Sequence, residues 1–238
     1  MKFSEKFYVG YSDITPQEEL SDGSLLKILE NVAVMHASSV HDGLKDSSGR
    51  WFLTAYHVKL HHRPLHEERV TAETWSRVMR GASSSREFAL YGEDGTLAAT
   101  ALSNWARVDQ STGRLQKIPA SLYEAYGSEP ESEAFPDPWI ERVPEEPAEY
   151  EKELSFTANR NYVDANRHMN NVYYYKLASL LLSDEEYEQV REFYIWYRQA
   201  IPYGTHFRAL LHRAGDVFTA ALKSEDLSET YALLRFLV

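Results

Sequence analysis

Hydrophobic positions along the chain follow a helical period first and then alternate as in strands, and this order occurs twice. In the first half, residues 24–40 carry apolar side chains at helical spacing, with Ser21-Asp22 as N-cap and Gly43 as stop. Strand-like runs follow at 51–61, 69–79, 86–92 and 96–109. The turn Glu93-Asp94-Gly95 predicts that the last two runs form a hairpin. Alternation in 51–61 predicts one face composed of Phe52, Thr54, Tyr56, Val58 and Leu60.

The second half repeats the plan. Residues 153–163 predict a strand, Asn170-Asn171 caps a helix over 172–182, and Ser183 to Glu186 form a capping box before a short helix ending near Val190. Four strands are then expected at 193–200, 205–213, 217–224 and 229–238. Short turns separate the last three, which predicts antiparallel pairing.

The two predicted helices align at a spacing of about 148 residues, which indicates an internal duplication. The helix at 172–182 is apolar or aromatic on nearly all sides, so it needs contact all round. A curved antiparallel sheet wrapped around a central helix provides that contact. We therefore predict an α+β fold with two similar halves.

An acidic, proline-rich segment separates the halves. Residues 124–153 hold five of the nine prolines and 11 acidic residues against Arg142 and Lys152, so they carry nine of the eleven net negative charges. This composition is typical of a solvated connector, and a surface strap without function is the simpler interpretation. The predicted organisation is a first half over 1–123, a connector over 124–153 and a second half over 154–238.

Composition excludes several classes of protein. The 238 residues contain no cysteine, which excludes disulfide scaffolds, thiolate metal sites and a cysteine nucleophile. No basic face for nucleic acid is evident, and no apolar run reaches the length of a membrane span. The N-terminal residues lack the features of a signal or transit peptide, so we expect a cytoplasmic protein.

The densest polar cluster beside apolar sequence is residues 164–171, Asp-Ala-Asn-Arg-His-Met-Asn-Asn, directly before the second central helix. A helix N-terminus offers N–H groups that can stabilise an oxyanion, and a histidine such as His168 can relay a proton near neutral pH. Asp164 is placed to orient that imidazole. On spacing alone, a tight loop of Asx-turns with an N-cap explains the same residues, and we prefer that interpretation at this point.

Other chemical signals are weak. His61, His62 and His66 suggest a metal, but the first two point to opposite faces of a strand and no carboxylate completes a set. The chain has no Gly-x-Ser-x-Gly elbow and no glycine-rich phosphate loop. We expect no metal and no cofactor.

Two segments resemble the acyl-ACP thioesterases of plants and bacteria, which are double hot-dog proteins. The first is Asp164-x-Asn166-x-His168-x-Asn170-Asn171 before an apolar helix, which resembles the family's active-site segment. The second runs from Asn104 to Pro119 and resembles the family's tryptophan-containing strand, the turn after it and the Arg-Leu-x-Lys-Ile-Pro sequence that ends the first half. The resemblance extends from about Phe7 to the C-terminus, and the missing transit peptide favours the bacterial branch.

The resemblance implies a tandem hot-dog that hydrolyses fatty acyl-ACP thioesters. It implies catalytic roles for Asp164, Asn166 and His168, with the thioester oxygen facing N–H groups near Asn170 and Asn171. At the 148-residue spacing, the first half has Pro16, Glu18 and Leu20 instead, so it holds no second copy of the site. The first half is expected to shape the acyl tunnel, with ordinary core as the simpler interpretation of its candidate lining residues Val32, Met35 and Tyr56. Because acyl carrier protein is acidic, we expect docking by arginines near the site: Arg160, Arg167, Arg198 and Arg208.

One position departs from the family pattern. The family places a carboxylate within Tyr-x-x-Glu before a glycine, and here Ala200 stands where that glutamate is expected, between Tyr197 and Gly204. Its loss leaves Asp164 with His168 as the general-base pair, or else a weakened enzyme.

Alternative functions stay open. They are an acyl-CoA thioesterase, a catalytically weakened acyl-binding protein and, less favoured, a hot-dog dehydratase in which Glu30 supplies the helix carboxylate. A tandem pair already forms the unit that single hot dogs make by dimerising, so both a monomer and a homodimer are compatible with the sequence.

Overall fold

The computed structural model describes residues 1–43, 49–132, 134–164 and 167–238, which form two units. The first unit comprises Met1–Ile140 and the second Glu141–Val238, so their boundary falls inside the segment 124–153. Each unit is an antiparallel sheet with one central helix. Within the described residues, no helix is long and apolar enough to cross a membrane.

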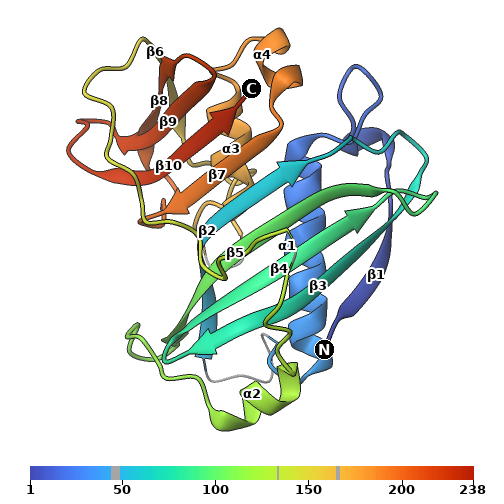
Figure 1. The fold of residues 1–238 in the computed structure, drawn as a ribbon. Helices are drawn as coiled ribbons and strands as arrows, with labels where there is room; N and C mark the ends of the chain where they lie inside the picture. Colours follow the sequence, from blue (N-terminus) through green and yellow to red (C-terminus); the bar gives the residue numbers. More distant parts are fainter. Residues whose placement is uncertain (44–48, 133, 165–166) are drawn as a thin grey trace. The chain divides into compact units, whose positions relative to one another are not determined.

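The first unit has a five-stranded sheet in the order β1-β3-β4-β5-β2. Its strands are β1 (Phe3–Tyr8), β2 (Gly49–Leu60), β3 (Arg69–Arg80), β4 (Ser83–Tyr91) and β5 (Leu97–Asp109). The long helix α1 (Asp22–Ser39) lies along one face of this sheet (Figure 1), and Ser21 caps its N-terminus by accepting from the Ser24 N–H. A 3-10 turn, η1 (Tyr11–Asp13), precedes it.

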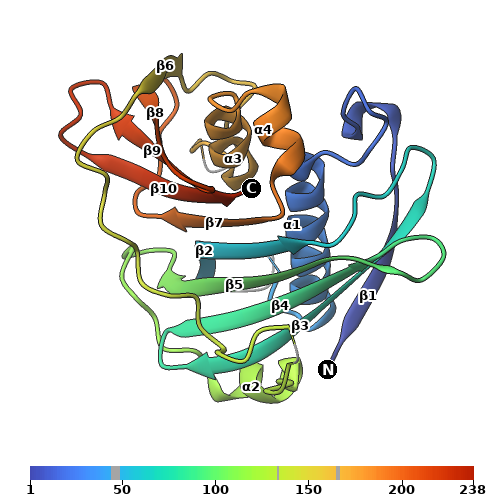
Figure 2. The same ribbon diagram turned by 45° about the horizontal axis from the view of Figure 1, so that its top comes forward.

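The second unit repeats this architecture with a sheet in the order β7-β10-β9-β8-β6. The strands are β6 (Lys152–Thr157), β7 (Glu192–Tyr197), β8 (His206–Ala214), β9 (Val217–Ser224) and β10 (Thr230–Leu237). Figure 2 shows them curving around the central helix α3 (Asn171–Ser179), whose Tyr175 ring packs against Phe193 and Phe236. The short helix α4 (Asp184–Gln189) follows and opens with the predicted capping box at Ser183. All pairings within each unit are antiparallel, as predicted.

The predicted inward face of one strand and the ends of two elements are wrong. In β2, a bulge between Leu53 and Ala55 reverses the alternation, so Phe52 is 49% exposed while Tyr56 is buried. The bulge adds one residue to the strand, which moves every preceding side chain to the other face. The strand predicted over 153–163 ends at Thr157, and the helix predicted to 182 ends at Ser179.

Two elements were not predicted from the pattern at all, β1 and the helix α2 (Ala120–Tyr126). A long-range contact holds α2 in place, because the Tyr126 hydroxyl donates to buried Asp42 at 3.0 Å. Asp42 also pairs with Arg107 at 3.1 Å and accepts from the Trp51 indole N–H at 2.7 Å. Such a contact between distant residues leaves no periodic signal in the local sequence.

The duplication is clearest in the turn that precedes each central helix. In the first unit the Thr15 N–H donates to Glu19 O, and in the second the Asp164 N–H donates to His168 O. The flanking bridges are Ile14 with Leu20 and Val163 with Met169. Each of these residues is 149 positions from its counterpart, so the predicted spacing of 148 is wrong by one residue.

The first part of the acidic connector belongs to the first unit and packs on it. Phe135 and Ile140 are buried, and the Arg77 guanidinium reaches the main chain of this segment. Arg77 donates to the carbonyls of Pro130, Phe135, Pro136 and Asp137. It also pairs with buried Glu87 at 2.6 Å, and burial raises the pKa of that carboxyl above its ordinary value. This part of the connector is therefore structural cover for the sheet, not a freely solvated strap.

The second part of the connector pairs with cations of the second unit. Glu146 contacts Arg198 at 3.1 Å and Lys223 at 2.6 Å, and it accepts from the Thr230 hydroxyl at 2.6 Å. Glu141 pairs with Arg235 at 3.1 Å. Much of the acidity of 124–153 is thus balanced within the chain.

We predict that Arg77→Met lowers the free energy of unfolding by about 3–5 kcal/mol, because it leaves the Glu87 charge buried without its partner. The control is Lys27→Met, which removes an exposed pair with Asp13 at 3.6 Å and is expected to cost under about 1 kcal/mol. Urea denaturation measures both. Equal effects for the two variants would show that Arg77 does not anchor the connector.

Candidate active site

Asp164 and His168, two of the three predicted catalytic residues, lie in the turn before α3. The Asp164 N–H donates to His168 O at 2.9 Å, and the Arg167 N–H donates to Asp164 O at 3.0 Å. Arg167 has φ of 62°, a left-handed conformation that is uncommon for a residue with a side chain. Asp164 is exposed and His168 is half-buried. Asn166, predicted with them, lies outside the described residues.

The N-terminus of α3 follows directly from this turn. The Asn170 side chain accepts from the Val172 N–H at 3.0 Å, and the Asn170 N–H donates to Tyr162 O at 2.8 Å. Among the described residues, none accepts from the N–H of Asn171, the first residue of the helix. Asn170 thus caps the helix, while the Asn171 N–H is available to an oxyanion.

A second segment, residues 199–204, lies against the turn. The Met169 N–H donates to Ile201 O at 2.8 Å, the Tyr203 N–H donates to Arg167 O at 3.0 Å, and His168 forms a bridge with Pro202. Ala200, the position of the missing carboxylate, is exposed in this segment. Residue 200 and the candidate base His168 are therefore held by one set of backbone contacts.

The same construction in the first unit carries different side chains. The Leu20 N–H donates to Pro64 O, as the Met169 N–H donates to Ile201 O, and the His66 N–H donates to Glu18 O, as the Tyr203 N–H donates to Arg167 O. By these equivalent bonds Pro64 corresponds to Ile201, and the preceding residue Arg63 corresponds to Ala200. Arg63 reaches Asp22, the first residue of α1, at 3.1 Å; the Asp22 side chain is buried and that of Arg63 is 9% exposed. An internal ion pair thus closes the N-terminus of α1, where the second unit has Ala200 and Asn171.

The one-residue change in spacing also corrects the first-unit counterparts of the predicted site. Asp164 and His168 correspond to Thr15 and Glu19 by their hydrogen bonds, and position 166 corresponds to Gln17 by the same offset. The predicted counterparts Pro16, Glu18 and Leu20 are therefore wrong. The corrected set also lacks a histidine.

The four predicted docking arginines differ in their contacts. Arg198 pairs with Glu146 at 3.1 Å and Arg208 pairs with Glu153 at 3.5 Å. Arg160 and Arg167 are exposed, and no ion pair is recorded for either among the described residues. Of the four arginines, Arg160 and Arg167 therefore have the more available positive charge.

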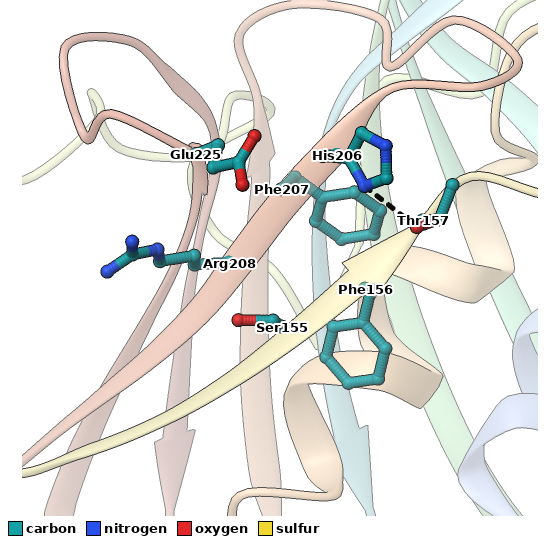
Figure 3. Close-up of a pocket in the computed structure, with 7 residues that line it drawn as sticks. All are labelled: Ser155, Phe156, Thr157, His206, Phe207, Arg208 and Glu225. Atoms are coloured by element: carbon teal, nitrogen blue, oxygen red, sulfur yellow. Dashed lines mark hydrogen bonds between the residues drawn. The ribbon is translucent and has the colours of Figure 1, made fainter.

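A shallow hollow of about 150 Å³ lies between β6 and β8 (Figure 3). It contains Arg208 and a hydrogen bond between Thr157 and His206, but neither Asp164 nor His168. Its volume is below the roughly 300–1,000 Å³ typical of ligand pockets, so it does not suggest a substrate site. The described residues also contain no group of three or more His, Asp or Glu side chains positioned to hold a metal ion.

Comparison with protein families identifies the first unit. A model of the acyl-ACP thioesterase N-terminal domain matches residues 1–126, which is more than half of the chain. The chain belongs to the acyl-ACP thioesterase family. The family predicted from the two sequence segments is thereby confirmed.

Individual relatives agree with this assignment. Oleoyl-acyl carrier protein thioesterase 1 of Arabidopsis thaliana, a chloroplastic protein, is 26% identical over 193 residues. That alignment covers 73% of this chain and 53% of the relative. The chain thus spans about half the length of the curated relatives it matches.

Solved structures of family members share the fold. An acyl-ACP thioesterase from Bacteroides thetaiotaomicron superposes with a TM-score of 0.87 at 21% identity, over 99% of this chain and 97% of that one. The 12:0-ACP thioesterase from Umbellularia californica gives 0.85 at 18% identity, over 99% and 96% of the two chains. The predicted α+β double hot-dog is confirmed.

Proposed function

We propose that this member of the acyl-ACP thioesterase family hydrolyses the thioester of fatty acyl-ACP and releases the free fatty acid. Family membership carries the proposal. The turn before α3 supports it, because that turn holds a histidine, an aspartate and a helix N-terminus within a few residues.

In the proposed mechanism, His168 removes a proton from water as the water oxygen attacks the thioester carbonyl carbon. The carbonyl oxygen becomes an oxyanion, which the Asn171 N–H and the positive end of α3 stabilise. As the carbon–sulfur bond breaks, His168 returns the proton to the departing thiolate. Asp164 supports the imidazole, and Asn166 orients the thioester.

The acyl chain itself needs an apolar channel, and we propose that the first unit supplies part of it. Val32 of α1 and Tyr56 of β2 are buried in the core of that unit, whereas Met35 is 37% exposed. Val32 and Tyr56 thus remain candidate lining residues, and Met35 is not part of that core. Ordinary core packing explains the burial of the other two equally well.

We predict that His168→Ala lowers kcat for acyl-ACP hydrolysis by about a hundredfold or more, the usual effect of losing a general base. Release of free acid and free thiol from acyl-ACP and acyl-CoA of several chain lengths measures the effect. The matched control is His61→Ala, an exposed histidine of the first unit, which is expected to retain full activity.

The same assay tests the alternatives. Faster hydrolysis of acyl-CoA than of acyl-ACP would replace the proposed carrier with coenzyme A. Tight acyl binding without turnover would indicate an acyl-binding protein. Full activity in His168→Ala would exclude the proposed base.

We predict that Ala200→Glu raises kcat about tenfold, because a carboxylate at this position adds a second base. In the first unit, Arg63 at the equivalent position reaches the first residue of α1, so a long side chain at 200 is expected to reach Asn171. Ala200→Gln is the control, since it has the same length without a base. An unchanged kcat in a folded Ala200→Glu protein would show that the missing carboxylate does not limit the rate.

We further propose that Arg160 and Arg167 meet the acidic carrier protein. Replacing either by alanine is expected to raise KM for acyl-ACP about fivefold at low salt, the equivalent of a surface interaction of about 1 kcal/mol. KM for acyl-CoA should not change, and added salt should reduce the difference. Arg80→Ala, at an exposed site of the first unit, is the control. Equal losses with both substrates would contradict a docking role.

A further inference from the structure

Tyr174 makes two hydrogen bonds that the proposed reaction does not use directly. Its ring lies on α3 and is 2% exposed. The hydroxyl donates to Gln199 O at 3.2 Å and accepts from the Ile201 N–H at 3.0 Å. It thus binds the backbone on both sides of Ala200.

The protonated hydroxyl suits this double contact. Burial raises the pKa of Tyr174 far above its ordinary value, and the charge of the Asp164 carboxylate acts in the same direction. Packing of the ring against Tyr197, at 5.2 Å between centroids, fixes where the hydroxyl lies. The hydroxyl therefore stays both a donor and an acceptor over the working pH range.

The backbone that Tyr174 holds is the one that lies against the candidate catalytic turn. Ile201 O accepts from the Met169 N–H at 2.8 Å, and Pro202 forms the bridge with His168. A chain of contacts thus leads from the α3 interior through residues 199–201 to the residue proposed as general base.

The first unit provides an internal comparison. At the 149-residue spacing Tyr174 corresponds to Leu25, which has no hydroxyl. By its backbone hydrogen bond Ile201 corresponds to Pro64, which has no N–H. The N–H donor and the hydroxyl acceptor are therefore both absent in the first unit, which has no counterpart of His168, and both present in the second unit. General packing needs of the fold do not explain the pair, since the first unit builds the same turn without it.

We propose that Tyr174 is a positioning residue, whose hydroxyl fixes residue 200 and, through Ile201, the turn that carries His168. This role rests on the proposed hydrolysis. Removing the hydroxyl leaves the substrate contacts in place but loosens the groups that act in the transition state. Such a change lowers kcat and leaves KM nearly unchanged.

The test compares Tyr174→Phe with Tyr194→Phe. The control also loses a hydrogen-bonded hydroxyl, because Tyr194 on β7 donates to Glu192 at 3.0 Å and stacks on Trp196. Tyr174→Phe is expected to lower kcat about tenfold with KM within about twofold, while Tyr194→Phe behaves as the unaltered protein does. Unchanged kcat in Tyr174→Phe would overturn the proposal.

A double substitution separates positioning from general destabilisation. The gain in kcat from Ala200→Glu is expected with Tyr174 present and is expected to disappear in the Tyr174→Phe background, because residue 200 is then no longer held. An equal gain in both backgrounds would overturn the role. Simple destabilisation lowers the amount of folded enzyme and does not remove this coupling.

Amide hydrogen exchange tests the role without turnover. The Ile201 amide should be protected in the unaltered protein, and exchange at Ile201 and Met169 should quicken at least about tenfold in Tyr174→Phe. If no acyl thioester is hydrolysed, the proposed function fails, and exchange alone then decides the positioning role. An unprotected Ile201 amide, or unchanged exchange in Tyr174→Phe, would overturn it.

Discussion

Backbone hydrogen bonding in the turn before each central helix fixes where that helix begins, and the chemistry proposed for the second unit depends on this start. The bond from the Asp164 N–H to His168 O closes the turn, and Asn170 then caps α3. The Asn171 N–H is thereby left at the helix end without a partner among the described residues. The turn needs a left-handed residue, Arg167 here and Glu18 in the first unit, and neither is glycine. Tertiary contacts must therefore offset that strain in both copies.

Duplication preserved this backbone and changed what it carries. In the first unit, Arg63 and Asp22 form an ion pair at the N-terminus of α1. In the second unit, Ala200 and Asn171 leave that end open, and Tyr174 supplies the bracing that a short side chain at 200 does not. One copy thus has an internal ion pair at this helix end, and the other has the polar groups to which we assign the proposed chemistry. The hydrogen bonds described in the two turns agree one by one, so the asymmetry lies in the residue types, including Pro64, which has no N–H, in place of Ile201.

Periodicity in the sequence predicted the central helices, most strands and the hairpin of β4 and β5, since each depends on neighbouring residues. Features that depend on distant contacts were not predictable. The bulge in β2 follows from pairing with β5, and α2 is held by the bond from Tyr126 to Asp42. The one-residue error in the duplication has a similar cause, because α3 is apolar on so many sides that a shift of one position leaves its pattern almost unchanged. The site segment was recognisable from residue types, but the contacts of Tyr174 with residues 199 and 201 have no local signal.

The acidic connector also bears on the proposed docking of an acidic carrier protein. A chain with a net charge of −11 should repel an acidic partner. However, residues 124–153 hold most of that charge, and some of their carboxylates form ion pairs within the chain. Glu146 forms ion pairs with Arg198 and Lys223, and Glu141 forms one with Arg235. Cations paired in this way attract a partner weakly, because their field is cancelled within a few ångströms. The connector therefore does more than join two units. Its acidic side chains occupy Arg198, Lys223 and Arg235, whereas Arg160 and Arg167, the proposed contacts of an acidic surface, have no ion pair among the described residues.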